Sequence, residues 1–187
     1  MNKEKEYMKS WIFIIFEKIN LKIMELLVET VVEQEISQYE IERNKPMPSK
    51  NHSIVQGNLT TEINILFRKQ FTLMPEVEIA MSSKPNCVPD IAIYPKLTFN
   101  FLDDELVMTD MPLTAIEIVS PSQSDNDIIK KINRYFEAGV KSCWFVMPDF
   151  QAISVYSSIG KYEFFTSEMT LIDRATGIEL PLGDIFS

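Results

Sequence analysis

The chain has 187 residues, which suits one domain with its own hydrophobic core and at most a short appendage. Its apolar fraction of 45% and charged fraction of 24% are typical of a soluble globular protein, and the apolar run at residues 11–16 is too short for a membrane span or a signal peptide. A net charge of −9 argues against tight, non-specific nucleic-acid binding, because such binders carry a basic face. We expect a cytoplasmic protein with no membrane contact.

Residues 1–38 have the apolar periodicity of a helix, with no proline or glycine. Its apolar positions at three- and four-residue spacing are Leu21, Met24, Leu27, Val28, Val31 and Val32. Residues 39–43 then alternate apolar and charged side chains before a turn at 44–46, which predicts a hairpin strand. We therefore predict an N-terminal helical extension over 1–38 and a separate domain over 39–187. The apolar surface of the extension predicts a homodimer.

The rest of the chain predicts an α/β fold with a mixed central β-sheet flanked by helices. One helix begins at residues 49–51 and runs to about residue 69, and a second covers 126–138 and ends at Gly139. The first helix has a core-facing stripe of Val55, Leu59, Ile63 and Leu66. Residues 100–111 are predicted to form a surface loop. The predicted strands are residues 71–81, 88–94, 113–119, 143–147, 153–156 and 162–165.

Several catalytic classes have no supporting motif in this sequence. Two distant cysteines, Cys87 and Cys143, and one histidine, His52, provide no zinc ligand set of the Cys/His type. No GxSxG motif accompanies His52, and neither a P-loop nor a GxGxxG motif is present. Carboxylates and lysines remain as candidate catalytic groups.

Two carboxylates and a lysine pair stand out in the predicted architecture. Asp90 begins a strand after a proline, and Glu117 lies in the middle of an otherwise apolar strand. A buried carboxylate is costly unless it is paired, hydrogen-bonded or bound to a metal. Lys130 and Lys131 follow on the next helix. At about 100° per residue, Lys131 falls at the border of the buried face and Lys130 points to solvent, so Lys131 is the better candidate to reach the strands.

Each residue also has a plainer interpretation when it is taken alone. Asp90 is typical of the start of a strand, and Glu117 fits the structural partner of an arginine. Lys131 is typical of a solvated helix lysine. Glu40 fits the solvent face of an edge strand, and His52 fits a surface residue near a helix start.

The order of these motifs resembles the PD-(D/E)XK nuclease superfamily. In that superfamily an Asp and a Glu on adjacent strands hold Mg²⁺, and a Lys two residues after the Glu contacts the attacking water. Asp90 matches the first acid and Glu117 the second, but Val119 stands at the usual lysine position. Positions i and i+2 of a strand project from the same face, so the departure at Val119 removes that lysine from the site.

A closer resemblance covers residues 39–186, which are similar to the Uma-two family of putative restriction endonucleases. In that family the lysine lies on the helix after the Glu strand, and Lys131 occupies that place. The matching stretches are residues 39–41, 47–49 with His52, 88–94, 116–122, Asp127 with Lys131 and Tyr135, 139–140, Trp144 with Val146, and 182–186.

The resemblance implies a restriction-endonuclease-like core that hydrolyses DNA phosphodiester bonds. Asp90, Glu117 and the Ile118 carbonyl would bind Mg²⁺ or Mn²⁺. Lys131 would orient or deprotonate the attacking water, and Glu40 would be an additional early acid. His52 would bind substrate.

The acidic net charge predicts weak, salt-sensitive binding to DNA. The alternative is a binding or dimerisation module with the same fold and little or no catalysis. The acidic charge and Val119 favour this alternative, whereas the two acids and the suitably placed lysine favour the enzyme.

Overall fold

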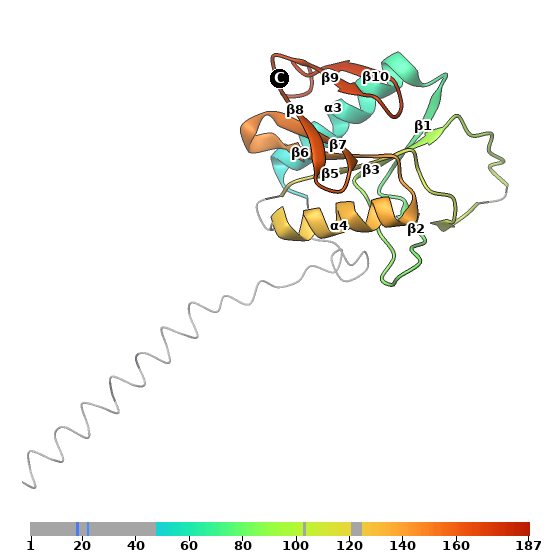
Figure 1. The fold of residues 1–187 in the computed structure, drawn as a ribbon, viewed down its shortest axis with the longest axis horizontal. Coiled ribbons are helices and arrows are strands. Elements are labelled where there is room, and N and C mark those ends of the chain that lie inside the picture. The colour runs from blue at the N-terminus through green and yellow to red at the C-terminus, as the bar shows by residue number, and fades with distance from the viewer. Residues whose placement is uncertain (1–17, 19–21, 23–47, 103, 121–124) are drawn as a thin grey trace, which may run out of the picture. The chain divides into compact units, whose positions relative to one another are not determined.

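The computed structural model describes residues 18, 22, 48–102, 104–120 and 125–187. The chain divides into two units, residues 1–47 and 48–187, and the labelled helices and strands all belong to the second unit (Figure 1). Residues 18 and 22 are helical. The rest of the predicted N-terminal helix, the predicted strand at 39–43 and the predicted domain boundary after residue 38 lie outside the described residues.

The second unit is built on a six-stranded mixed sheet with the order β1–β3–β5–β6–β7–β8. Strands β5 and β6 are parallel, and all other neighbouring pairs are antiparallel. The strands are β1 (Phe71–Pro75), β3 (Ile91–Pro95), β5 (Thr114–Ile118), β6 (Ser142–Met147), β7 (Ala152–Ser158) and β8 (Lys161–Thr166). A parallel pair requires a crossover connection, and helix α4 (Asp125–Ala138) lies within it. The predicted α/β class is confirmed.

Four shorter strands lie outside the central sheet. Strand β2 (Glu78–Ile79) pairs in parallel with β4 (Val107–Met108), and β9 (Thr170–Asp173) pairs antiparallel with β10 (Ile178–Pro181). The prediction of one strand over residues 71–81 is therefore wrong, because the chain turns after Pro75. The predicted loop at 100–111 contains β4, and the β9–β10 hairpin was not predicted.

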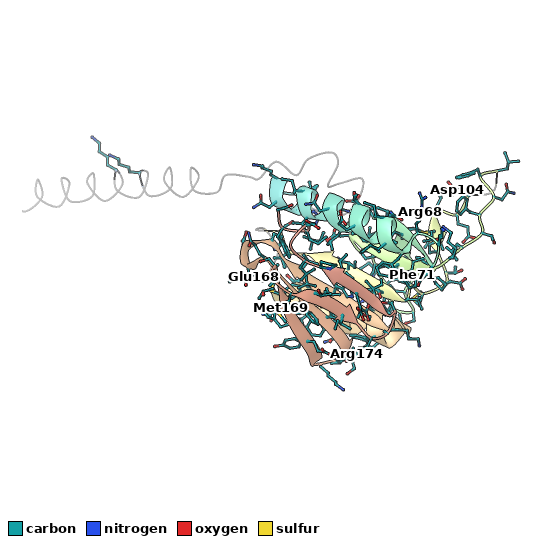
Figure 2. All side chains as sticks on the ribbon, turned by 90° about the horizontal axis from the view of Figure 1, so that it is seen from above. Arg68, Phe71, Asp104, Glu168, Met169 and Arg174 are labelled. Carbon is teal, nitrogen blue, oxygen red and sulfur yellow. The ribbon has the colours of Figure 1, made fainter. Side chains whose placement is uncertain are left out.

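Two helices cover opposite faces of the sheet (Figure 1), and Figure 2 shows helix α3 over one of these faces. Helix α3 (Lys50–Phe67) buries Val55, Leu59 and Ile63 in the cluster that includes Ile91 on β3. Helix α4 contributes buried side chains to the second cluster, on the other face. The prediction that Leu66 faces the core is wrong, because Leu66 is 50% exposed. Phe67, which continues the four-residue spacing, packs against the core instead.

The ends of both helices follow from local sequence. Ser49 caps α3 with its Oγ, which accepts a hydrogen bond from the His52 backbone N–H at 3.3 Å. Gly139 follows α4 with a φ of 102°, a left-handed conformation that glycine adopts without steric cost. A 3₁₀ turn, η1 (Pro148–Phe150), follows β6. Among the described residues, no helix is long and apolar enough to cross a membrane.

Candidate active site

The backbone positions of the two candidate acids lie side by side at one end of β5. Ile91 of β3 pairs with Ile116 of β5, so Asp90, one residue before β3, lies across from Glu117. The Asp90 backbone N–H donates to the Ile116 carbonyl at 3.0 Å and holds the chain in this position. Both side chains are buried, with exposures of 1% for Asp90 and 2% for Glu117. The strand register therefore brings two buried carboxylates from separate strand ends into one region.

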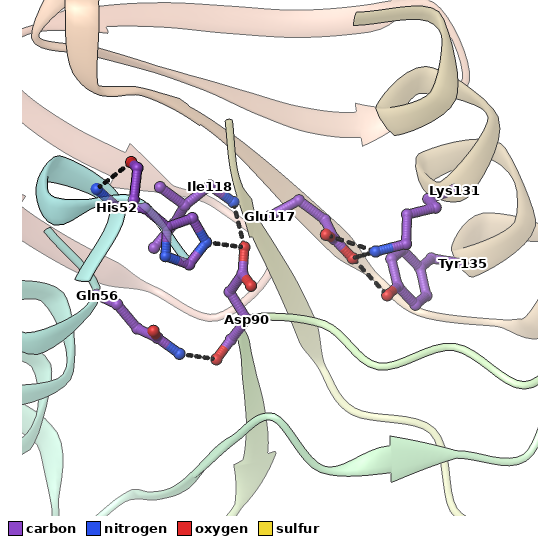
Figure 3. A network of polar contacts seen from close by, with 8 residues as sticks. His52, Gln56, Asp90, Glu117, Ile118, Lys131 and Tyr135 are labelled. Carbon is purple, nitrogen blue, oxygen red and sulfur yellow. Dashed lines mark hydrogen bonds and ion pairs between the residues drawn. The ribbon is translucent and has the colours of Figure 1, made fainter. Parts of the chain in front are cut away.

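Asp90 is held by groups from α3 and β5 (Figure 3). Its Oδ2 accepts a hydrogen bond from the Ile118 backbone N–H at 2.6 Å. The same oxygen lies 3.1 Å from His52 Nε2. Gln56, one turn after His52 on α3, donates from Nε2 to the Asp90 carbonyl at 2.9 Å. Helix α3 therefore contacts both the side chain and the backbone of this acid.

Glu117 is held from the opposite side, by α4. Lys131 Nζ donates to Glu117 Oε1 at 2.9 Å and to Oε2 at 2.8 Å. Tyr135, one helical turn after Lys131, donates its hydroxyl to Oε1 at 2.7 Å. In Figure 3 the Asp90 carboxylate points toward His52 and the Glu117 carboxylate points toward Lys131 and Tyr135. Each acid thus has its own donors from a different helix.

The two adjacent lysines of α4 have different surroundings, as their helical phase predicted. Lys131 is 27% exposed and reaches Glu117, whereas Lys130 is 75% exposed and pairs with Asp127 at 3.2 Å. A lysine at the border of the buried face can lay its aliphatic chain along the core and extend its amine toward the strand end.

The charges of Asp90, Glu117 and Lys131 influence the pKa values of Glu117 and Lys131. Burial raises the pKa of Glu117, Lys131 opposes this, and the negative charge of Asp90 raises it further. For Lys131, burial lowers the pKa, but the charge and hydrogen bonds of Glu117 and the charge of Asp90 outweigh it, so its pKa is raised. Lys131 therefore keeps its proton at neutral pH and acts as a fixed positive charge. It has no lone pair with which to accept a proton.

The donor chemistry of this region fits a hard divalent cation. Asp90 and Glu117 supply carboxylate oxygens, which Mg²⁺ and Mn²⁺ prefer. The Ile118 N–H points toward Asp90, and the N–H and C=O of one strand residue point to the same side, so the Ile118 carbonyl is directed there too. Among residues 48–102, 104–120 and 125–187, no three His, Cys, Asp or Glu side chains are grouped to hold a metal ion. A cation at this site would complete its shell with other ligands.

The other predicted site residues have different outcomes. Glu40 lies outside the described residues. The interpretation of His52 as a surface residue is wrong, because its side chain is 3% exposed and faces Asp90. Sequence reasoning missed Gln56 and the contact of Tyr135 with Glu117. The match of Tyr135 to the family motif was the only signal for the second residue, and nothing in the sequence marked the first.

Comparisons with known proteins agree with this architecture. The Uma2 (Uma-two) family model, described as putative restriction endonuclease, matches residues 22–182. The crystal structure of a putative nuclease belonging to DUF820 from Anabaena variabilis ATCC 29413 has a TM-score of 0.66 and 24% identity, and the match covers 76% of this chain and 83% of that one. A DrdV–DNA complex has a TM-score of 0.31 and 12% identity over 71% of this chain and 9% of that one, a similarity too weak to indicate a shared fold. The search of curated proteins found no match.

Proposed function

Because the chain belongs to the Uma2 family of putative restriction endonucleases, we propose that it is a metal-dependent endonuclease that hydrolyses DNA phosphodiester bonds. The family supports a nuclease-like function, and the fold matches that of a putative nuclease. The observation that carries the finer proposal is that buried Asp90 and Glu117 lie at neighbouring strand ends, close enough for their charges to interact, and that Lys131 binds Glu117. Two buried acids beside one protonated lysine are expensive for folding alone and are typical of a catalytic site.

In this proposal Asp90, Glu117 and the Ile118 carbonyl hold Mg²⁺ or Mn²⁺. When bound, such an ion polarises a phosphodiester and lowers the pKa of water. Lys131 orients the attacking water and offsets negative charge on the phosphate. Lys131 contacts both Glu117 oxygens at 2.8 and 2.9 Å and Tyr135 also contacts Oε1, so Oε2, with one donor of the three, is the oxygen better placed to bind an ion. The partial exposure of Lys131 gives the amine room to turn toward substrate.

Two further residues belong to the proposed site. Glu40 is proposed as an additional acid that helps to hold the ion or its water. His52 was expected to bind substrate, but its burial and its contact with Asp90 favour a role in supporting Asp90.

The test compares the two neighbouring lysines of α4. We expect Lys131→Ala to lose about 100-fold or more of Mn²⁺-dependent nicking of supercoiled plasmid, which is the typical loss for one transition-state donor. Lys130→Ala is the matched control, because it removes the same group from the adjacent, exposed position and should change nicking less than about twofold. Equal losses, or a loss confined to Lys130→Ala, would contradict the proposal. Calorimetry separates the alternative binding module, which would bind no Mn²⁺ or bind it without nicking.

We also propose DNA as the substrate, a cytoplasmic location and a homodimer. With a net charge of −9, binding to DNA should be weak and fall steeply as salt is added. Within the described residues, the loop after β3 supports self-association. It carries Phe99, Phe101, Leu102 and Leu106 with exposures of 62%, 90%, 96% and 88%. Exposed apolar patches of this kind mark protein contacts. Light scattering of the full chain would measure its mass directly.

A further inference from the structure

His52 is a polar side chain in an apolar position. Four side chains of α3 are buried, and the other three are Val55, Leu59 and Ile63. The His52 ring is 3% exposed, so almost none of it reaches solvent. An aliphatic residue at this position would extend the core stripe of the helix without burying polar atoms. The histidine therefore needs a reason other than packing.

The two ring nitrogens of His52 have opposite effects: Nε2 makes a contact with Asp90, whereas burial of Nδ1 costs folding free energy. Nε2 lies 3.1 Å from Asp90 Oδ2, which is a good distance for donation to a carboxylate. Nδ1 is buried without a hydrogen-bond partner, and an unsatisfied buried polar atom costs folding free energy. This donation requires a proton on Nε2. The imidazole thus carries an uncompensated nitrogen in order to make one contact with Asp90.

Asp90 needs such support because it lies outside the strand. It precedes β3, where the ladder of the sheet begins at Ile91. Its backbone is tied by its own N–H to Ile116 and by Gln56 to its carbonyl, and its Oδ2 is tied by Ile118 and His52. His52 and Gln56 are four residues apart on one rigid helix, so they present two donors to a single residue. Holding Oδ2 sets the plane of the whole carboxylate.

We propose that His52 is a positioning residue that holds the Asp90 carboxylate in the orientation required for divalent-cation binding. This inference rests on the proposed function, because it takes Asp90 as a ligand. Groups that hydrogen-bond a metal ligand typically change metal affinity by about 10- to 100-fold when they are removed. Helix α3 thereby contributes to the site without touching the cation or the DNA.

The experiment compares Gln and Asn at position 52, because their side-chain amides differ in length. In His52→Gln the amide nitrogen takes the approximate place of Nε2, whereas in His52→Asn the shorter side chain places it nearer to Nδ1, away from Asp90. His52→Leu removes both nitrogens. Ser53→Gln is the control, because Ser53 is exposed on the same turn. Mn²⁺ affinity of the full chain is measured by calorimetry, and thermal unfolding is measured without metal.

We expect His52→Asn and His52→Leu to weaken Mn²⁺ binding about 10- to 100-fold, while His52→Gln and Ser53→Gln stay within about threefold of the wild type. Metal-free His52→Leu should unfold below the wild-type temperature, because buried Asp90 loses a donor, and removal of the unsatisfied Nδ1 offsets part of this loss. Wild-type affinity in the Asn and Leu variants, or equal losses in the Gln and Asn variants, would overturn the inference and leave the proposed function standing. If the Mn²⁺ affinities follow this pattern but the wild type does not nick DNA, the inference is supported and the proposed nuclease activity is refuted. A wild type that binds no Mn²⁺ would refute both.

Discussion

The hydrogen bond from Tyr135 to Glu117 should stabilise the fold more than an ordinary tyrosine hydrogen bond. Its hydroxyl lies 2.7 Å from Oε1 of a carboxylate that is 2% exposed. The tyrosine ring is fully buried, so Tyr135→Phe keeps the packing and removes only the donor. Tyr94 provides a matched control, because it is 1% exposed and donates at 3.1 Å to a neutral acceptor, the Asp110 backbone carbonyl.

The difference in acceptor charge sets the expected magnitudes. A hydrogen bond to a charged group contributes about 1.5–3 kcal/mol to stability, and a bond between neutral groups contributes about 0.5–1.5 kcal/mol. Tyr135→Phe should therefore lower the free energy of unfolding by about 2 kcal/mol and Tyr94→Phe by about 1 kcal/mol. In a Glu117→Gln background the acceptor is neutral, so the cost of Tyr135→Phe should fall to about 1 kcal/mol.

The assay is urea unfolding followed by circular dichroism at pH 7, with a chelator present so that no metal binds. The four proteins of the Glu117–Tyr135 cycle and the Tyr94→Phe control are compared at equal concentration. Equal costs for the two tyrosine variants would refute the role of acceptor charge. An unchanged cost of Tyr135→Phe in the Glu117→Gln background would show that Tyr135 does not act on Glu117.

Two further predictions concern the rest of the fold. Asp173 is 1% exposed, and its Oδ2 accepts hydrogen bonds from Thr114 at 3.2 Å and Trp144 at 2.9 Å, so Asp173→Ala should cost about 2–4 kcal/mol in urea unfolding by leaving both donors unsatisfied. Asp184 is exposed and serves as the control, so Asp184→Ala should change the free energy of unfolding by less than about 0.5 kcal/mol. A similar cost for Asp173→Ala and Asp184→Ala would contradict this reasoning. Burial raises the pKa of Tyr94 to about 12 from its ordinary value of 10.0, so the unfolded chain loses this proton first and stability falls between those pH values. From pH 8 to pH 11 the wild type should lose about 1.4 kcal/mol more than Tyr94→Phe in urea unfolding, and parallel pH profiles would contradict this.

Periodicity in the sequence was sufficient to find the main elements. The spacing of Val55, Leu59 and Ile63 predicted α3, and the near-continuous apolar run around Glu117 predicted β5 as a central strand. These signals are local, because a helix or strand repeats its buried positions every 3.6 or 2 residues whatever it packs against. The helical phase that separates Lys131 from Lys130 is local in the same sense, and the structure shows the same separation.

The motif order was sufficient to identify the family, which the match over residues 22–182 shows. It could not indicate how each acid is held. Asp90 and Glu117 were predicted as one pair, but their donors come from different helices, His52 on α3 and Lys131 and Tyr135 on α4. That division depends on how the helices pack on the two faces of the sheet.

The remaining errors come from contacts between distant parts of the chain. The β9–β10 hairpin is short, and Asp173 ties it to Thr114 on β5 and Trp144 on β6. His52 has the phase of a core residue, but an imidazole at a helix start gives no local sign of burial. Burial of His52 is offset by the carboxylate of Asp90, 3.1 Å away. A polar side chain can stay inside only where the tertiary structure brings a partner to it, so local periodicity determines the elements and long-range packing decides which polar groups are buried.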